Sequence, residues 1–263
     1  MTVYYITMIA LIVGAYLLGN VNVSIIISRF KNRDVRKIGS GNPGTMNMLR
    51  SFGIKLGVLT LILDALKGAI PALLGWWLLG KGEMFSFGAD KIGLFIGGIS
   101  VVLGHIFPVF YKFKGGKGVA ASIGVCFVAA PIVALIAFAV GVLFILTVKI
   151  GSLTSFIMTG IPLIYCSVTA FSSGRIIEGV LAALIYLIIL IAHHSNFVRI
   201  FKGEEKQVIL FGRNKSANAV QNKDSESSLM QEGTAPGNVT EQNAHSVGSE
   251  KNEGDAGEKK DLP

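Results

Sequence analysis

Three lysines and three glycines gather where one apolar run ends and the next begins. The segment is GHIFPVFYKFKGGKGVA, residues 104–120, and the residues are Lys112, Lys114, Lys117, Gly115, Gly116 and Gly118. Backbone amides at a glycine-rich turn entering a helix form a concave set of donors, and lysines add positive charge around them. Residues 112–118, the Gly-Lys loop, therefore predict a phosphate site. Lysines are also ordinary in a cytoplasmic loop between membrane helices, but the glycines favour a shaped site.

A second polar segment, residues 29–50, combines many cations with the turn-forming sequence GSGNPG at 39–44. Short polar side chains in such a turn can hydrogen-bond an anion or a hydroxyl, and an arginine offers a planar fork to phosphate. The candidate donors are Ser40, Asn42, Asn47 and Arg50. We expect this segment to be a cytoplasmic loop.

Asp64 and Lys67 stand inside an apolar run, three residues apart and hence on one helix face. A charge this deep in a membrane helix costs roughly 2.5 to 3.5 kcal/mol on insertion scales, so the pair needs mutual pairing or a wet cavity. Two interpretations stay open. Lys67 contributes to a substrate site, or the two residues form a structural ion pair that locks helix packing.

A third polar segment, HHSNFVRIFKGEEK, follows the last apolar run. His193, Asn196 and Arg199 share one helical face if the helix continues past the membrane surface. A single histidine at such a position is often only an interfacial residue. The presence of Asn196 and Arg199 on the same face strengthens the interpretation as a site, and both interpretations stay open.

The composition shows what must position these residues. The chain has 263 residues, of which 15% are charged, and a mean hydropathy of +0.60. This profile is typical of a polytopic membrane protein and excludes a soluble core. The two cysteines lie inside apolar runs, so neither a disulfide framework nor a metal cluster is expected.

The C-terminal part differs in charge and polarity. Residues 1–212 carry 18 Lys or Arg against 7 Asp or Glu, whereas residues 213–263 carry 6 against 9. The second part is rich in Asn, Ser, Gly, Glu and Lys and cannot bury enough apolar surface to offset its ordering entropy. We therefore expect a membrane domain at 1–212 and a disordered polar tail at 213–263.

Six apolar runs are long enough to matter for membrane insertion. They are residues 4–28, 53–80, 92–110, 119–148, 156–171 and 180–192. The run at 119–148 is long for one span, and Pro131 allows a tight turn between two short helices. With that turn the chain has seven spans, and only Lys81, Lys91 and Arg175 fall outside, as the positive-inside rule prefers.

This topology has consequences for the site. The N-terminus lies outside and the C-terminus is cytoplasmic. The segments around Ser40, Lys117 and His193 then share one face of the membrane, together with the smaller loop KIGSLTS at 149–155.

The three polar segments resemble a known family. SGNPG followed by Asn47 and Arg50, GHIFPVFYKFKGGKGVA, and His193 with Asn196, Arg199 and Glu205 are similar to the motifs of the bacterial integral-membrane acyl-phosphate:glycerol-3-phosphate acyltransferases. The resemblance covers roughly residues 5–206 and includes DALKG at 64–68. It implies seven membrane helices in the cytoplasmic membrane and an active site on the cytoplasmic face.

The resemblance also implies a reaction. An acyl chain passes from acyl-phosphate to the sn-1 hydroxyl of glycerol 3-phosphate, giving lysophosphatidic acid and phosphate. The implied catalytic residues are Ser40, His193 and Asn196. The implied substrate-binding residues are Asn42, Asn47, Arg50, Lys67, Lys114, Gly115, Gly116, Lys117, Ser152, Ser155, Arg199 and Glu205. The partners are the two substrates and the lipid bilayer, with no nucleic acid, and no cofactor or metal is expected.

The sequence departs from the family pattern at a few positions. Thr45 and Met46 stand where the family usually has Ala-Thr, which puts a threonine contact to acyl-phosphate in doubt. Ala121 replaces a common Thr, and His194 a common Arg.

The chemistry suits these residues. Both substrates are anionic and acyl-phosphate is already activated, so the protein needs mainly to orient the hydroxyl and stabilise developing charge. No convincing Ser-His-Asp set is present, which favours direct attack without an acyl-enzyme. An acyl-CoA enzyme is disfavoured because the usual His-x4-Asp pair is missing. A transporter or flippase for a phosphate-bearing substrate is the alternative from another class, since intramembrane Asp64 and Lys67 also suit a transport path.

Overall fold

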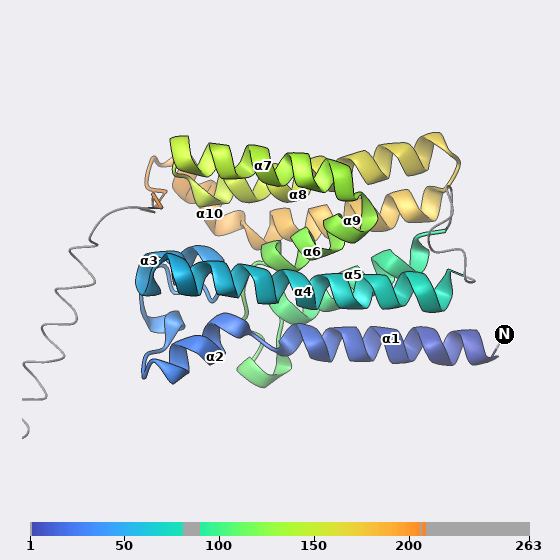
Figure 1. Ribbon diagram of the computed structural model, residues 1–263, viewed down its shortest axis with the longest axis horizontal. Coiled ribbons are helices and arrows are strands. Elements are labelled where there is room, and N and C mark those ends of the chain that lie inside the picture. Colours follow the sequence, from blue (N-terminus) through green and yellow to red (C-terminus); the bar gives the residue numbers. More distant parts are fainter. Residues whose placement is uncertain (1, 81–89, 206, 209–263) are drawn as a thin grey trace, which may run out of the picture. The chain divides into compact units, whose positions relative to one another are not determined.

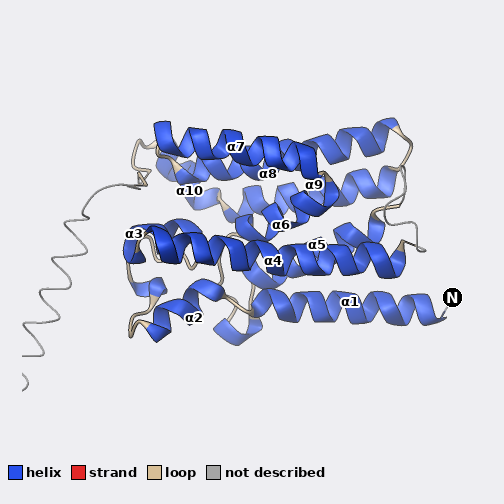
Figure 2. Cartoon of the chain, viewed as in Figure 1, coloured by secondary structure: helices blue, strands red, loops and turns tan. Residues whose placement is uncertain are grey.

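A computed structural model of the chain describes residues 2–80, 90–205, 207 and 208. These residues form helices joined by short turns (Figure 1). The helices are α1 (Thr2–Asn20), α2 (Val23–Phe30), η1 (Val35–Lys37), α3 (Thr45–Phe52), α4 (Ile54–Leu79), α5 (Ile92–Ile106), η2 (Val109–Tyr111), α6 (Val119–Ala129), α7 (Pro131–Thr147), α8 (Gly151–Ser172), α9 (Ile176–Ala192) and α10 (His194–Phe201). Figure 2 shows that the described part of the chain is helical, and its one extended pairing is an isolated bridge between Ile150 and Gln207. The all-α prediction is confirmed.

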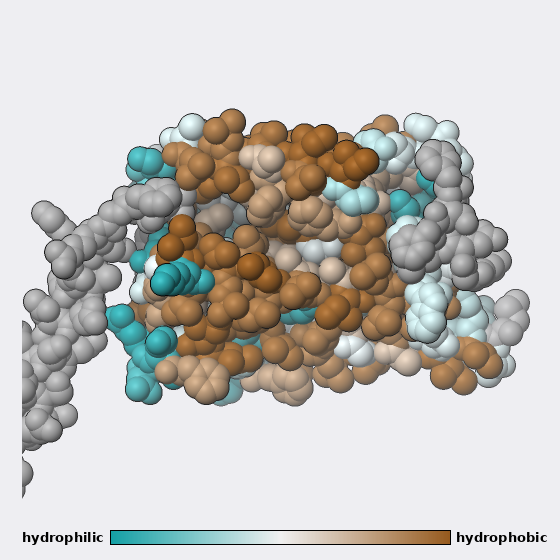
Figure 3. Space-filling model, viewed as in Figure 1, coloured by the Kyte–Doolittle hydropathy of each residue, from teal (hydrophilic) through white to brown (hydrophobic). Residues whose placement is uncertain are grey.

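The helices are apolar enough for a membrane. Four stretches have the length and composition of a span, namely Thr2–Phe30, Ile54–Leu79, Ile92–Tyr111 and Gly151–Ser172. The pair α9 and α10, bent by 55°, is a fifth candidate, and α6 and α7 are shorter apolar helices. Apolar side chains cover much of the face in Figure 3. The count of seven spans and the side of each terminus stay predictions.

Two boundaries differ from expectation. Residues 4–28 do not form one helix, because α1 ends at Asn20 and α2 begins at Val23. The Asn22 side chain accepts a hydrogen bond from the Ile25 amide at 3.1 Å and so caps a new helix. Residues 149–155 are not a loop either. Helix α8 begins at Gly151, and the Ser155 hydroxyl donates to the Gly151 carbonyl within its first turns.

The break in the long apolar run lies where it was predicted. Helix α6 ends at Ala129 and α7 begins at Pro131, whose fixed φ suits a first helical position. Helix α6 leads away from the Gly-Lys loop, and the last turns of α7 lie at the same cavity as that loop. The start of α8 therefore returns to the Gly-Lys loop.

The helices pack through small residues. Helix α5 packs on α1 and α4, α8 packs on α7 and α9, and α6 contacts α4, α5, α7 and α8. A side chain at Gly68 of α4 would collide with the Ala121 backbone of α6, and one at Gly124 with the Ala65 backbone. Such close backbone approach is common where small residues meet in membranes.

The short helices α2, α3 and α10 gather at one end of the long helices (Figure 1). The predicted tail at 213–263 and Lys81 lie outside the described residues.

Candidate active site

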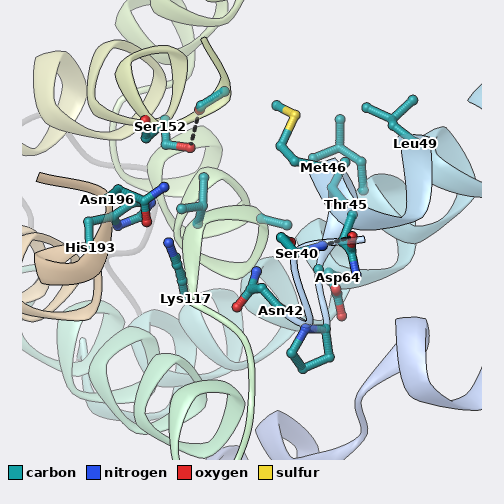
Figure 4. A pocket seen from close by; sticks show the side chains of 18 of the residues that line it. Ser40, Asn42, Thr45, Met46, Leu49, Asp64, Lys117, Ser152, His193 and Asn196 are labelled. Atoms are coloured by element: carbon teal, nitrogen blue, oxygen red, sulfur yellow. Dashed lines mark hydrogen bonds between the residues drawn. The ribbon is translucent and has the colours of Figure 1, made fainter. Parts of the chain in front are cut away.

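A cavity of about 710 Å³ lies at the end of the bundle where α3, α6, α8 and α10 meet. Figure 4 shows part of its lining, with the Lys117 side chain extending toward His193 and Asn196. Of the residues predicted for the site, those that line the cavity are Ser40, Asn42, Asn47, Arg50, Lys114, Gly115, Lys117, Ser152, Ser155, His193, Asn196, Arg199 and Glu205. The structure thus brings together residues more than 150 positions apart in the chain.

The Gly-Lys loop is folded differently from the sequence-based expectation. The Gly115 amide donates to the Ile106 carbonyl at 3.2 Å, and the Gly116 amide donates to the His105 carbonyl at 3.1 Å. These two amides are therefore used to close the loop on α5 and do not point at a ligand. A side chain at Gly116 would collide with the His105 ring, which explains why glycine is needed there.

Lys117, one of the lysines of this loop, directly follows those two glycines. Gly118 adopts a left-handed φ of 78° and starts α6, whose first residues Val119 and Ala120 line the cavity together with Lys117. The first amides of a helix have no partner within it, and they favour an anion. Lys117 and the N-terminus of α6 thus present positive charge to the same space.

The ammonium of Lys117 is available to bind an anion. Its ammonium makes no hydrogen bond or ion pair within the described part of the chain. The pKa of Lys117 is lowered to about 8, chiefly by burial and then by the positive charge of Arg199. Glu205 opposes this shift in part, and Arg50 adds a smaller lowering effect. An incoming phosphate would stabilise the charged ammonium and so oppose this shift.

Glu205 holds three predicted site residues together. Its carboxylate accepts from the Ser152 hydroxyl at 2.9 Å, from Asn196 Nδ2 at 2.6 Å and from Arg199 Nε at 2.9 Å. Burial alone would raise the pKa of Glu205, but these hydrogen bonds and the Arg199 charge lower it overall. Glu205 is therefore ionised, and its carboxylate links the start of α8 to α10 through hydrogen bonds.

Asn47 organises the polar loop that precedes α3. Its Nδ2 donates to the carbonyls of Val35 and Ile38, at 2.9 and 3.0 Å, and its Oδ1 accepts from the Ser40 amide at 2.9 Å. Both donors of the amide and one lone pair of its oxygen are used in this way. Asn47 thus fixes the backbone beside Ser40, and Ser40 itself is exposed at the cavity.

Arg50 and His193 lie on other walls of the cavity. Arg50 Nε donates to the Gln207 carbonyl at 3.2 Å, and burial lowers the pKa of Arg50. The Nδ1 atom of His193 lies 2.8 Å from the Ile189 carbonyl. This contact favours the tautomer that carries its proton on Nδ1 and leaves Nε2 as an acceptor. Burial and the Lys117 charge lower the pKa of His193 to about 4.

Lys67 and Gly116 do not line the cavity. The Lys67 ammonium lies 2.8 Å from Asp64 Oδ1 and donates to the Gly19 and Val21 carbonyls, at 3.3 and 2.7 Å. These carbonyls are at the end of α1, where a cation is favourable. The geometry supports the interpretation of a structural ion pair.

The polar lining residues that were not assigned to the site from sequence include Thr45, His105 and Asp64. Thr45 Oγ1 and His105 Nδ1 are buried without a hydrogen-bond partner among the described residues. His105 Nδ1 lies 3.9 Å from Asp64 Oδ1. Thr45 is the first residue of α3 and directly follows the GSGNPG turn, so its place in the chain could have marked it as a site residue. The position of His105, by contrast, depends on how the Gly-Lys loop folds back on α5.

The remaining wall of the cavity is apolar. Its side chains come from α4, α6, α7 and α8: Ile54, Val58, Leu61, Ile123, Phe138, Val142, Ile145, Leu146 and Met158. On α4 and α7, Ile54, Val58, Val142 and Leu146 are also exposed on the surface that would face lipid. The cavity therefore joins a cationic wall to an apolar groove that opens toward the membrane.

Helices apolar enough to span a bilayer define an integral membrane protein, and its two-part cavity has the charge and polarity that suit an amphipathic anion. The family described as "Glycerol-3-phosphate acyltransferase" matches residues 9–203. The glycerol-3-phosphate acyltransferase of Aquifex aeolicus (strain VF5) is 38% identical over 195 residues, covering 74% of this chain and 96% of the relative. That of Mycoplasmopsis pulmonis (strain UAB CTIP) is 36% identical over 214 residues, covering 76% and 92%.

Two solved structures are also similar. The crystal structure of PlsY (YgiH), an integral membrane glycerol 3-phosphate acyltransferase, in the glycerol 3-phosphate form has a TM-score of 0.65 and 38% identity, covering 78% of this chain and 96% of that one. The lysophosphatidic acid form has a TM-score of 0.63 and 37% identity, covering 77% and 96%. This chain belongs to the glycerol-3-phosphate acyltransferase family and is an integral membrane acyltransferase.

Proposed function

We propose that the protein transfers an acyl chain from acyl-phosphate to the sn-1 hydroxyl of glycerol 3-phosphate and releases lysophosphatidic acid and phosphate. The observation that carries this proposal is the cavity itself, in which a cation-rich wall meets an apolar groove. Five cationic side chains and two carboxylates line it: Arg36, Arg50, Lys114, Lys117 and Arg199, with Asp64 and Glu205. Similar proteins have been solved in glycerol 3-phosphate and lysophosphatidic acid forms.

The phosphate groups are held by the cationic wall. Lys117, the N-terminus of α6, Arg50 and Arg199 supply positive charge from segments that are far apart in sequence. Gly115 and Lys114 complete the loop side of this wall, and Asn42 and Ser155 lie at its edges. The acyl chain lies in the apolar groove between α4 and α7, with its carbonyl near the polar wall.

Direct transfer accounts for the chemistry. The sn-1 hydroxyl oxygen attacks the carbonyl carbon of acyl-phosphate, an ester bond forms, and the bond from that carbon to the phosphate oxygen breaks. The hydroxyl proton goes to the departing phosphate or to His193 Nε2. Ser40 and Asn196 orient the reacting groups, and the cations stabilise the negative charge that develops.

Glu205, Asn47 and Ser152 act mainly by positioning. Glu205 fixes Asn196 and Arg199, and Asn47 fixes the backbone of Ser40. Lys67 stabilises the neighbouring helices through Asp64 and the end of α1.

We propose seven spans, with the N-terminus outside and this cavity at the cytoplasmic face of the bacterial inner membrane. The segments around Ser40, Lys117, Ser152 and His193 line one cavity, which supports a shared face. The start of α1 lies at the opposite end of the bundle from α10, which also suits this topology (Figure 1).

Purified protein in lipid, given acyl-phosphate and glycerol 3-phosphate, tests the proposal. We expect lysophosphatidic acid and phosphate in equal amounts, with no product from acyl-CoA or without the acceptor. Ser40→Ala abolishes turnover while the protein stays folded. An acyl group trapped on Ser40 in a stopped reaction would overturn direct transfer, and movement of substrate across proteoliposomes without product would favour a transporter.

A further inference from the structure

The apolar groove ends at a defined point inside the protein. On α7 its lining residues are Phe138, Val142, Ile145 and Leu146, and no residue of α7 before Phe138 lines it. The preceding residues that face inward, Ala134 and Ala137, are buried in helix contacts. Phe138 is therefore the last side chain of the groove on this helix.

The packing around Phe138 explains why the groove ends there. The ring of Phe138 lies against that of Phe127 on α6, with centroids 6.1 Å apart and planes tilted by 60°. Phe127 itself does not line the cavity and packs on the apolar core. On the other side, α4 and α6 come into backbone contact at Ala65 and Gly124, which leaves no room for a chain to continue between them.

The length of the groove matches the length of a lipid chain. Leu146 and Phe138 are eight residues apart on one helix, which corresponds to about 12 Å along its axis. One leaflet of hydrocarbon is about 15 Å thick, half of a bilayer core. A chain of ordinary membrane-lipid length, with its head at the cationic wall, thus brings its end to Phe138 or slightly past it.

From this geometry we infer that Phe138 is a specificity-determining residue that sets the preferred length of the acyl chain. The inference rests on the proposed function and adds which feature of the acyl donor the protein selects, namely the length of its chain. A chain that ends before Phe138 leaves part of the groove unfilled and loses contacts there. A longer chain must bend out between α4 and α7 into lipid.

The selection is steric, and this limits its size. Before binding, the acyl chain already lies among lipid tails, which are as apolar as the groove, so transfer into the groove gains little hydrophobic free energy. What differs between chain lengths is the fit at the closed end. Pockets that discriminate by one or a few methylenes give about tenfold or more in kcat/KM.

The test compares acyl-phosphates of different length in competition, with glycerol 3-phosphate as acceptor and proteoliposomes containing equal mole fractions of myristoyl and stearoyl phosphate. Phe138→Ala extends the groove toward Phe127 and raises the ratio of stearoyl to myristoyl product about tenfold relative to the unmodified protein. Phe138→Trp shortens the groove and lowers that ratio. Leu143→Ala is the matched control, because Leu143 lies on the lipid side of the same helix, is 64% exposed and does not line the cavity.

Each outcome is informative. A shift with Phe138→Ala in one direction and with Phe138→Trp in the other, absent from the Leu143 control, supports the assignment. An unchanged ratio in both Phe138 variants that still turn over overturns it. If Phe138→Ala does not fold, the Phe138→Trp and Phe138→Leu ratios decide. Absence of transfer from any acyl-phosphate by the unmodified protein would instead reject the proposed function.

Discussion

Two charged clusters in this protein, one buried and one half-buried, differ in how their charges are matched. Lys67 lies 2.8 Å from Asp64 and donates to two backbone carbonyls, so its charge is fully compensated. Lys117 has no such partner within the described residues, and Arg50 and Arg199 add further positive charge nearby. In the first cluster, Asp64 with Lys67, the protein itself supplies the counter-charge to the lysine, and we call it the closed cluster. In the second, the open cluster of Lys117, Arg50 and Arg199, a counter-charge that contacts Lys117 has to come from outside.

The comparison separates stabilising charges from substrate-binding charges. Lys67 and its carboxylate partner lie one helical turn apart, so local sequence is enough to bring them together. The cations around Lys117 come from three separate segments and repel one another. Glu205 offsets part of this repulsion. A bound anion would offset more of it, and this is the reason to place the substrate phosphates there.

The largest expected effect is a loss of stability when the ion pair of the closed cluster, Lys67 with Asp64, is broken. Lys67→Met leaves the Asp64 carboxylate buried without its cation, which costs about 3 to 5 kcal/mol of folding free energy. We expect a strong loss of thermal stability in detergent. The double variant Asp64→Asn/Lys67→Met removes both charges and restores most of that stability, a coupling that a double-mutant cycle measures. A fully stable Lys67→Met protein that has lost only activity would place Lys67 in the substrate site instead.

The next largest effect is a loss of activity when Lys117 is removed from the open cluster. Lys117→Met removes a charge that has no hydrogen-bonded or ion-paired partner among the described residues, so we expect unchanged or slightly higher stability and a loss of kcat/KM of about a hundred- to a thousandfold. Lys112→Met is the matched control, since Lys112 belongs to the same loop and does not line the cavity. Comparable activity of the two variants would contradict the role of Lys117 as a phosphate ligand.

Much of this contrast could be predicted from sequence. Hydropathy predicted the long helices and the turn before Pro131, and the spacing of polar residues, together with the family resemblance, predicted most of the polar lining of the cavity. Residues such as Ser40, Lys117 and His193 were found because their segments carry polar groups that an ordinary loop does not need.

The remaining features depend on tertiary contacts that no local pattern contains. The glycine amides of the Gly-Lys loop bond back to α5, which depends on how that helix ends. His105 enters the cavity wall for the same reason. Asn22 breaks the first helix by capping α2, a competition between local hydrogen bonds that hydropathy does not register.

A smaller effect on activity is expected at Glu205, the carboxylate that accepts hydrogen bonds from Arg199 and Asn196 beside the open cluster. Glu205→Gln keeps the shape of the side chain but weakens its charge-assisted hydrogen bonds to Arg199 and Asn196, and we expect kcat/KM to fall about tenfold. Steady-state kinetics with Glu204→Gln as control measure this effect, because Glu204 is exposed and does not line the cavity. Equal kinetics for the two variants would show that the hydrogen bonds of the Glu205 carboxylate are not needed for activity.

The smallest effect is a pH dependence that the closed cluster should not share. The pKa of Lys117 in the empty site is about 8, lowered by burial and by Arg199 and Arg50, so the protonated fraction falls as pH rises through that value. Because only the ammonium attracts phosphate, KM for glycerol 3-phosphate should be nearly constant below about pH 7.5 and rise above about pH 8, by at most about tenfold for each pH unit. The substrate phosphate loses its second proton near about pH 6 and does not contribute to this change. Lys117→Arg keeps its charge throughout and flattens the profile, even if its affinity differs. A rise in KM that persists in the Lys117→Arg variant would assign the titration to another group.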